Sequence, residues 1–257
     1  MISCEFIILG SSAGMPQPGR VNSGYVLSVD GKHYQFDCGG GVSAAFRGAG
    51  LNPLALDSIF ISHTHPDHIC ELPLYIQMLY LAGRKEPVTI FMPEEAIVPI
   101  QDYFNALYLF REKLPFEIHF EPVARGTMIE RNGMSIHPIH NSHLIGYTDI
   151  IRSYGFPNKM QSFSYLISVE GKSILYSADL GSEKDLGPFM TDVDLLVVES
   201  THIEPASLFD LAIDYHVKKT VLTHIAEILD INAVKNAADK AGYDGLIIAE
   251  DGLRITL

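Results

Sequence analysis

The segment "HTHPDH" at residues 63–68 places three histidines and one aspartate within six positions. Neutral imidazoles and carboxylates are the side chains that bind zinc-like ions, and ligands close together in sequence lose little entropy when they assemble into one site. A single histidine here would be an ordinary solvated loop residue. The set His63, His65, Asp67 and His68 instead favours a metal-binding site.

The residues before this segment indicate how such a site would be positioned. The run "SIFIS" at 58–62 is rich in β-branched and aromatic side chains, which predicts a buried strand. A strand that ends at Ser62 delivers the next side chains into a loop at the edge of a sheet, and Pro66 stiffens that loop. The four polar side chains are therefore expected together at a strand end.

Strand-like and helix-like segments are mixed along the chain, which favours an α/β or α+β fold over an all-β barrel. The expected strands are 4–9, 24–29, 33–37, 58–62, 88–91, 117–120, 134–140, 163–169, 173–177, 194–199, 220–223 and 246–249. The expected helices are 41–50, 71–82, 94–109, 205–217 and 230–242. The segment 144–162, rich in glycine, tyrosine and polar residues, is expected to be a mobile loop.

Two segments of the chain are similar to each other. "SGYVLSVDGK" (23–32) and "FSYLISVEGK" (163–172) each predict a strand, a turn of an acidic residue and glycine, and the start of a second strand. An apolar strand that ends in histidine follows both, in "SIFISHTH" and "LLVVESTH". Such hairpins are common, but the repeated order of three elements indicates two related halves that could share a site.

The motif "HTHPDH" resembles the H-x-H-x-D-H signature of the metallo-β-lactamase superfamily. Other landmarks occur in order over nearly the whole chain, and "SSAGMPQPGRVNSGYVL" at 11–27 is similar to the branch of tRNA 3′-processing nucleases (ribonuclease Z-like) and small phosphodiesterases. The resemblance implies an α/β (α+β) fold, a four-layer αββα metallo-β-lactamase sandwich of two pseudo-repeated halves. It also implies a single domain over 1–257, with halves of about 1–140 and 141–257.

The same resemblance implies a ligand set for two divalent metal ions. The matching positions are His63, His65, Asp67, His68, His143, Asp179 and His224. The first two histidines and His143 would hold one ion, Asp67, His68 and His224 the other, and Asp179 would bridge them. An all-histidine first site favours Zn²⁺, while Mn²⁺, iron and Ni²⁺ stay open.

The choice of His143 depends on a count along the strand at 134–140. His140 is the alternative ligand, because it ends the same strand. The residues expected to act in catalysis are Asp67, Asp179 and His202. His202 follows a strand and could donate a proton to a leaving group; the alternative is a supporting or exposed histidine. Asp37, in the family's Asp-Cys-Gly element, is expected to orient the first ligands.

The implied function is a metal-dependent hydrolase, namely a phosphodiesterase acting on a small molecule or nucleotide. Bound metal lowers the pKa of water to about 7 and so generates a hydroxide nucleophile. Two alternatives stay open: an iron-dependent oxidoreductase of the same fold, and a non-catalytic metal-binding carrier or accessory protein. His65 stands where the family's diiron members carry glutamate, which favours the hydrolase.

Charge and composition restrict the expected partners. The net charge is −13, from 31 acidic and 18 basic residues, so nucleic acid is expected to be an unlikely partner and a dedicated tRNA-processing nuclease is not expected. The segment 144–162 contributes only Arg152 and Lys159 as basic residues, and Val198 stands where that branch carries a histidine. The expected partner is a small-molecule ester substrate; a homodimer is left open.

The location of the protein is predicted from two further features. No apolar run reaches the roughly 18 to 20 residues that span a bilayer, so no membrane association is expected. The start of the chain lacks a basic region before its apolar stretch and is interpreted as a strand, not as a signal peptide. Cys4, Cys38 and Cys70 show no paired spacing. We therefore predict a reducing, cytoplasmic location.

Overall fold

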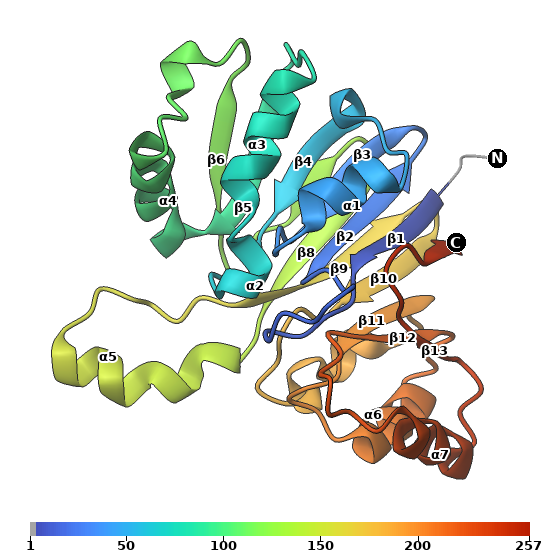
Figure 1. Cartoon of the computed structure of the whole chain (residues 1–257). Coiled ribbons are helices and arrows are strands. Elements are labelled where there is room, and N and C mark those ends of the chain that lie inside the picture. Colours follow the sequence, from blue (N-terminus) through green and yellow to red (C-terminus); the bar gives the residue numbers. More distant parts are fainter. Residues whose placement is uncertain (1–3) are drawn as a thin grey trace. The chain divides into compact units, whose positions relative to one another are not determined.

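The computed structural model describes residues 4–257 (Figure 1). These residues form two compact units, one of 4–124 with Glu250–Leu257 and one of Arg125–Ala249. Each unit contains one seven-stranded mixed sheet. No helix in the described part of the chain is both long and apolar enough to cross a membrane. The single domain predicted over 1–257, with halves that meet near residue 140, stays a prediction.

The first unit has the sheet order β14-β1-β2-β3-β4-β5-β6. Its strands are β1 (Cys4–Gly10), β2 (Gly24–Val29), β3 (Lys32–Phe36), β4 (Leu56–Phe60), β5 (Val88–Pro93), β6 (Ile118–Val123) and β14 (Arg254–Thr256). Its α-helices are α1 (Val42–Gly48), α2 (Pro66–Ile69), α3 (Leu72–Leu81) and α4 (Glu94–Ala106), with short 3₁₀ helices η1 (Pro53–Ala55) and η2 (Arg111–Lys113).

Helices cover one face of this first sheet. Alternate residues of β4 and β5, such as Ile59 and Ile90, point to the same side and pack with Phe46 of α1 and Tyr75 of α3 in one buried cluster. The opposite face carries stacked aromatic rings, with Phe60 lying between Phe36 and Phe91 at centroid distances of 4.9 and 4.8 Å. The neighbouring strand β5 is buried along its whole length, and its sequence VTIFMP is a nearly continuous apolar run.

The second unit has the sheet order β13-β12-β11-β10-β9-β8-β7. Its strands are β7 (Ile129–Arg131), β8 (Met134–His140), β9 (Phe163–Val169), β10 (Lys172–Tyr176), β11 (Leu195–Glu199), β12 (Thr220–Thr223) and β13 (Leu246–Ile248). Its helices are α5 (Thr148–Tyr154), α6 (Pro205–Asp214) and α7 (Ile231–Ala241), with 3₁₀ helices η3 (His143–Tyr147), η4 (Glu183–Asp185) and η5 (Gly187–Met190).

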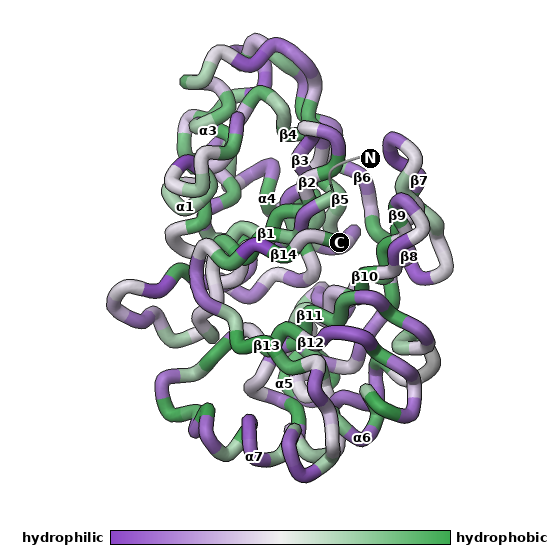
Figure 2. The backbone as a smooth tube through the Cα atoms, turned by 90° about the vertical axis from the view of Figure 1, so that its right-hand side faces the viewer, coloured by the Kyte–Doolittle hydropathy of each residue, from purple (hydrophilic) through white to green (hydrophobic). Residues whose placement is uncertain are grey.

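The core of the second unit lies between its sheet and the helices α6 and α7. Phe209 of α6 and Val234 of α7 are buried with Leu196, Val198 and Leu222 of the central strands. In Figure 2, hydrophobic residues lie along β12, and hydrophilic residues lie on the outer turns of α7. The helices of this unit therefore follow the usual arrangement in which one apolar helix face packs on a sheet.

The predicted repeat extends to whole sheets. Taken from the β14 edge and from the β7 edge, the two sheets have the same succession of partners: three antiparallel pairings followed by three parallel ones. The acidic–glycine turns also match, because Asp30 and Gly31 have φ of 47° and 78°, and Glu170 and Gly171 have φ of 50° and 72°. Such pairs of positive φ values suit tight hairpin turns.

α5 and β14 are among the described elements that the sequence analysis missed. Residues 148–154, inside the segment expected to be a mobile loop, form α5, which projects from the rest of its unit (Figure 1). Gly155 ends this helix in the left-handed conformation with φ 67°, a common helix stop. The three-residue strand β14 pairs with β1 from the other end of the chain, a long-range contact that local patterns do not predict.

A buried histidine makes the stability of the first unit sensitive to pH. Burial, with a contribution from Arg254, lowers the pKa of His33, whose ring lies edge-on to Phe46 and contacts the Ser28 hydroxyl. The unfolded chain therefore takes up a proton at His33 near pH 6.5 that the folded chain resists, so folded stability falls as the pH drops below about 6.5.

We expect H33Q to unfold at a midpoint temperature that declines less between pH 7 and 5.5 than that of the parent chain. Thermal unfolding followed by circular dichroism measures this decline. H119Q, at a side chain that is 45% exposed, is the matched control. An equal decline in H33Q and the parent chain would contradict this account.

Candidate metal centre

The first unit brings its four predicted ligands together directly after β4. His63 and His68 are buried, with their ring centroids 4.2 Å apart, and His65 lies 4.7 Å from His63. Asp67 Oδ2 lies 3.4 Å from Nε2 of His68. The sequence put this segment in a loop, but Pro66–Ile69 form the short helix α2, begun by proline at its first position. The helix turns Asp67 and His68 toward the histidines that precede it.

A buried carboxylate orients this group. Asp37 follows β3 with a left-handed φ of 55° and accepts hydrogen bonds from the Ser62 N–H at 2.7 Å and the Ser62 hydroxyl at 2.8 Å. Its Oδ2 also lies 2.8 Å from Nδ1 of His68. Asp37 therefore connects the end of β4 to His68, the third histidine of the segment, a contact that suits an orienting role.

The loop after β3 also contacts the ligand loop through its backbone. Cys38 N–H donates to the His68 carbonyl at 2.7 Å, and a Cβ on Gly39 would come within 2.0 Å of the Asp67 carbonyl oxygen. No side chain fits at Gly39, which explains the glycine in "FDCGGG". Burial, with the charges of Asp37 and Glu71, raises the pKa of the Cys38 thiol. A raised pKa favours the protonated, unreactive form of this thiol.

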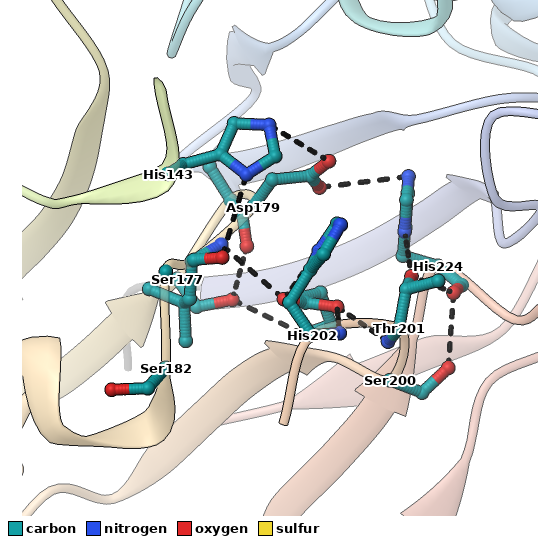
Figure 3. A network of polar contacts seen from close by, with 12 residues as sticks. His143, Ser177, Asp179, Ser182, Ser200, Thr201, His202 and His224 are labelled. Carbon is teal, nitrogen blue, oxygen red and sulfur yellow. Dashed lines mark hydrogen bonds and ion pairs between the residues drawn. The ribbon is translucent and has the colours of Figure 1, made fainter. Parts of the chain in front are cut away.

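The second unit brings together His143, Asp179 and His224 (Figure 3). Nε2 of His143 lies 3.7 Å from one Asp179 oxygen, and Nε2 of His224 lies 3.5 Å from the other. These residues follow β8, β10 and β12, which run in the same direction because two antiparallel steps separate β8 from β10. Their carboxyl ends therefore share one edge of the sheet, the usual location of ligand sites in α/β proteins.

His140, the alternative to His143, lies elsewhere. It is the last residue of β8, its side chain is exposed, and its ring lies edge-on to Phe163 at 5.7 Å. His143 is the first residue of η3, beyond the strand, and its side chain is buried against Asp179. The structure thus places His143, and not His140, beside the other two predicted ligands of its unit.

Four of the predicted histidine ligands share one feature: Nδ1 of each ring lies against an oxygen of the protein. The partners are the Ser62 hydroxyl for His63 at 3.0 Å, Asp37 for His68 at 2.8 Å, the Leu180 carbonyl for His143 at 3.4 Å and the Thr201 hydroxyl for His224 at 2.7 Å. The Asp37 carboxylate and the Leu180 carbonyl can only accept, and the Ser62 hydroxyl already donates to Asp37. These three partners therefore hold the proton on Nδ1 and leave the lone pair on Nε2, the form in which histidine binds a metal.

The chemistry of the donor set fits divalent metal ions. All seven predicted ligands belong to groups of His and Asp that could hold a metal ion, as found among the described residues. Five imidazoles and two carboxylates suit zinc and neighbouring transition metals better than magnesium or calcium, which prefer oxygen ligands.

A second carboxylate organises the region around His202. Glu199, the buried last residue of β11, lies 3.0 Å from Nδ1 of His202 and also accepts the backbone N–H groups of Thr201 and His202. The His202 ring is 4.9 Å from that of His143, and its side chain is 40% exposed. The sequence analysis missed Glu199, although a carboxylate that ends an apolar strand was the available signal.

The family of the chain follows from a comparison with known protein families. A family model described as "Anti-Pycsar protein Apyc1" matches residues 4–228. The chain belongs to this family. The match begins with β1 and ends after His224, so it includes all seven predicted ligands of this Apyc1-family protein.

Relatives of this Apyc1-family chain agree with its architecture. A curated protein named "Ribonuclease Z" from Parabacteroides distasonis is 26% identical, with 100% of both chains aligned. The metallo-beta-lactamase fold protein YhfI from Bacillus subtilis has a TM-score of 0.80 at 18% identity over 100% of both chains. The short form of human tRNase Z has a TM-score of 0.74 at 20% identity over 98% of both chains.

These findings confirm several predictions. The chain has the metallo-β-lactamase sandwich fold, with one seven-stranded sheet in each unit. It belongs to the superfamily branch of tRNA-processing nucleases and phosphodiesterases, and the predicted class of a metal-dependent phosphoric diester hydrolase is confirmed. The number and identity of its metal ions stay predictions, as does a homodimer.

One expectation about partners is wrong. Nucleic acid was expected to be an unlikely partner, whereas a relative aligned over the full length carries the name Ribonuclease Z, an enzyme that acts on RNA. The net charge of −13 misled because it sums over the whole surface. Part of the negative charge, including Asp67 and Asp179, lies in the candidate metal centre, where bound cations would offset it. The charge argument against a tRNA-processing nuclease is lost for the same reason.

We expect H143A to lose bound metal and H140A to retain it, because only His143 lies against Asp179. Elemental analysis after purification without chelator, followed by zinc titration, measures the difference. H140A is the matched control, being an exposed histidine three residues away on the same chain segment. Metal loss in H140A with retention in H143A would reverse the assignment.

Proposed function

We propose that the chain is a dinuclear metallohydrolase that cleaves a phosphodiester bond in a small molecule or nucleotide. His63, His65 and His143 would hold one ion, and Asp67, His68 and His224 the other, with Asp179 shared between them. The support comes from each unit separately: the first brings four of these side chains together and the second brings three together. Zn²⁺ is the proposed metal.

The observation that carries this proposal is the shared orientation of four imidazoles. In each, an oxygen of the protein engages Nδ1. For His63, His68 and His143 this oxygen is an acceptor, which selects the tautomer with its lone pair on Nε2. Satisfying one nitrogen of a buried histidine is common, but the same choice in predicted ligands of both units is what a metal centre requires. When bound, the ions would supply charge stabilisation at substrate oxygens and lower the pKa of a coordinated water.

The remaining chemistry would fall to His202. Glu199 holds Nδ1 of His202, so Nε2 faces away from that carboxylate and can carry a proton to a leaving oxygen. The ring is 40% exposed, which leaves it accessible to a substrate, and it lies beside His143. We propose that His202 donates this proton and that Glu199 keeps the ring oriented.

The iron-dependent and non-catalytic alternatives gain no specific support from these contacts. A carrier needs neither an oriented proton donor nor a carboxylate behind it, and both are present in the second unit. The substrate class is taken from the branch of relatives, and RNA enters the test because a relative's name states it. The cytoplasmic location proposed from the three cysteines also stays open to test.

We expect two metal ions per chain. Elemental analysis of protein purified without chelator and then loaded with zinc or manganese should approach two equivalents, because both parts of the ligand set are present. H68A should retain one ion, since the three histidines of the other set remain. A reproducible single equivalent in the parent chain would exclude the dinuclear centre.

We expect the metal-loaded chain to hydrolyse bis(p-nitrophenyl) phosphate, with weak or no β-lactam turnover. D179A should reduce the rate at least about a hundredfold, because the contacts of Asp179 to both His143 and His224 are lost. D192N, at an aspartate that is 78% exposed in the same unit, is the control. Cyclic and linear nucleotide diesters and a precursor tRNA, assayed at low and moderate salt, then identify the substrate class. Fast lactam hydrolysis without any diesterase activity would refute the proposal.

The proton-donor role predicts a dependence on the leaving group. H202A should slow cleavage of a diester with a poor leaving group, such as a nucleoside alcohol, by about 10²–10⁴-fold. It should change p-nitrophenolate release little, because that group leaves without protonation. E199Q should follow the same pattern to a smaller extent. An equal loss on both substrates would show that His202 has a structural role instead.

A further inference from the structure

The carboxylate of Asp185 joins two loops of the second unit. Asp185 ends η4, and its oxygens accept the Ser142 N–H at 3.1 Å, the Ser142 hydroxyl at 2.9 Å and the Gly181 N–H at 2.9 Å. Ser142 immediately precedes His143, and Gly181 comes two residues after Asp179. One carboxylate therefore binds the loop that carries a proposed ligand to the loop that carries the proposed bridge.

The two loops are in close contact at this point. A Cβ on Gly181 would lie 2.0 Å from the Ser142 hydroxyl oxygen, so only glycine allows the approach. Next to this contact, Nδ1 of His143, the residue after Ser142, lies 3.4 Å from the carbonyl oxygen of Leu180, the residue before Gly181. On the other side of the same ring, His143 Nε2 lies 3.7 Å from Asp179 Oδ2. The position of the His143 imidazole thus depends on the contact between the two loops, which the hydrogen bonds of Asp185 hold together.

Helix capping alone does not account for Asp185. Ser182 and Asp185 form a capping box at η4, which explains a contact of Asp185 to the Ser182 N–H. That contact is 3.5 Å long, whereas the hydrogen bonds to Gly181 and Ser142 are 2.9 to 3.1 Å long. The stronger interactions connect the loops and lie outside the helix, because hydrogen bonds weaken steeply with length.

We propose that Asp185 is a positioning residue for His143, and thereby sets the affinity of the metal ion that His143 binds. The inference rests on the proposed metal centre and extends it to a residue outside the ligand set. Asp185 touches neither metal nor substrate; it holds the backbone of residues 142 and 181. Without its charge, the loop before η3 keeps the Asn141 contacts to the His143 N–H and Ser164, but the carboxylate hydrogen bonds that join it to the Asp179 loop are weakened.

The test compares D185N with the control D194N, using zinc alone as the ligand. Asp194 belongs to the same unit and also accepts a backbone N–H, from Ser173 at 2.9 Å, but it precedes β11 and pairs with Lys218. Competition with a chromophoric chelator gives the zinc affinities. Thermal unfolding with and without zinc gives the gain in midpoint temperature on binding, a quantity that a purely structural carboxylate would not change.

We expect D185N to lower the affinity for one of two zinc ions about ten- to a hundredfold and to reduce the gain in midpoint temperature on zinc binding. D194N should lower the midpoint temperature of both forms and leave the affinities unchanged. In an H143A background, D185N should cause no further loss of affinity, because the ligand it positions is already absent. Wild-type zinc affinities in D185N, with a lowered midpoint of the zinc-free form, would overturn the inference.

The same measurements separate this inference from the proposed function. Fewer than two ions in the parent chain would refute the dinuclear proposal itself. Two ions in the parent chain, one in H143A and two at full affinity in D185N would refute the role of Asp185 alone. If D185N does not fold, S142A provides the test, because it removes the hydrogen bond of the Ser142 hydroxyl to the same carboxylate. A smaller loss of affinity for the same zinc ion is then expected. Unchanged zinc affinity in S142A would then overturn the inference.

Discussion

An imidazole buried beside other imidazoles can bind a metal ion well only if its second nitrogen has a hydrogen-bond partner within the protein. Burying a polar atom without a hydrogen bond costs several kcal/mol in order of magnitude, so each ligand histidine needs an acceptor as well as a place. Asp37 meets this need for His68, and Thr201 does so for His224. Much of the polar structure at the strand ends of both units consists of such acceptors and of the groups that hold them.

Each unit has a serine and a carboxylate at the ends of two neighbouring strands, but the two side chains have exchanged strands between the units. In the first unit a carboxylate follows β3 (Asp37) and accepts the N–H of a serine that follows β4 (Ser62). In the second unit a serine follows β10 (Ser177), and its hydroxyl accepts the N–H of a glutamate at the end of β11 (Glu199). The carboxylate has changed strands, yet in both units it orients a histidine in the loop that follows. The repeat therefore preserves the backbone framework while its polar residues have diverged.

The same framework explains why net charge was a poor guide to partners. Several acidic side chains of this chain are held inside hydrogen-bond networks, where they accept hydrogen bonds from backbone N–H and hydroxyl groups. Asp185 and Glu199 belong to this class. Such groups contribute to a net charge of −13 without presenting a repulsive surface to a phosphate backbone. A prediction from the sum of charges could not distinguish them from exposed carboxylates.

The sequence by itself determined the fold class, the repeat and most of the candidate ligands. These depend on short-range information: the spacing of His63, His65 and His68 in one loop, and apolar runs that predict strands. Asp179 and His224 were assigned from the resemblance to the metallo-β-lactamase superfamily, because no local pattern connects residues so far apart in sequence. Short or isolated elements, such as β14 and α5, were missed because long-range pairing or a weak local pattern forms them.

Only the tertiary structure decided which groups support these ligands. The contacts of Asp185 to Ser142 span 43 positions in sequence, and those of Asp37 to His68 span 31, so no local pattern reports them. The distinction between His140 and His143 is of the same kind: both follow one strand, and only the packing of the loop shows which ring lies against Asp179. Hydrogen-bond partners are chosen by distance and direction in space, which sequence spacing does not contain.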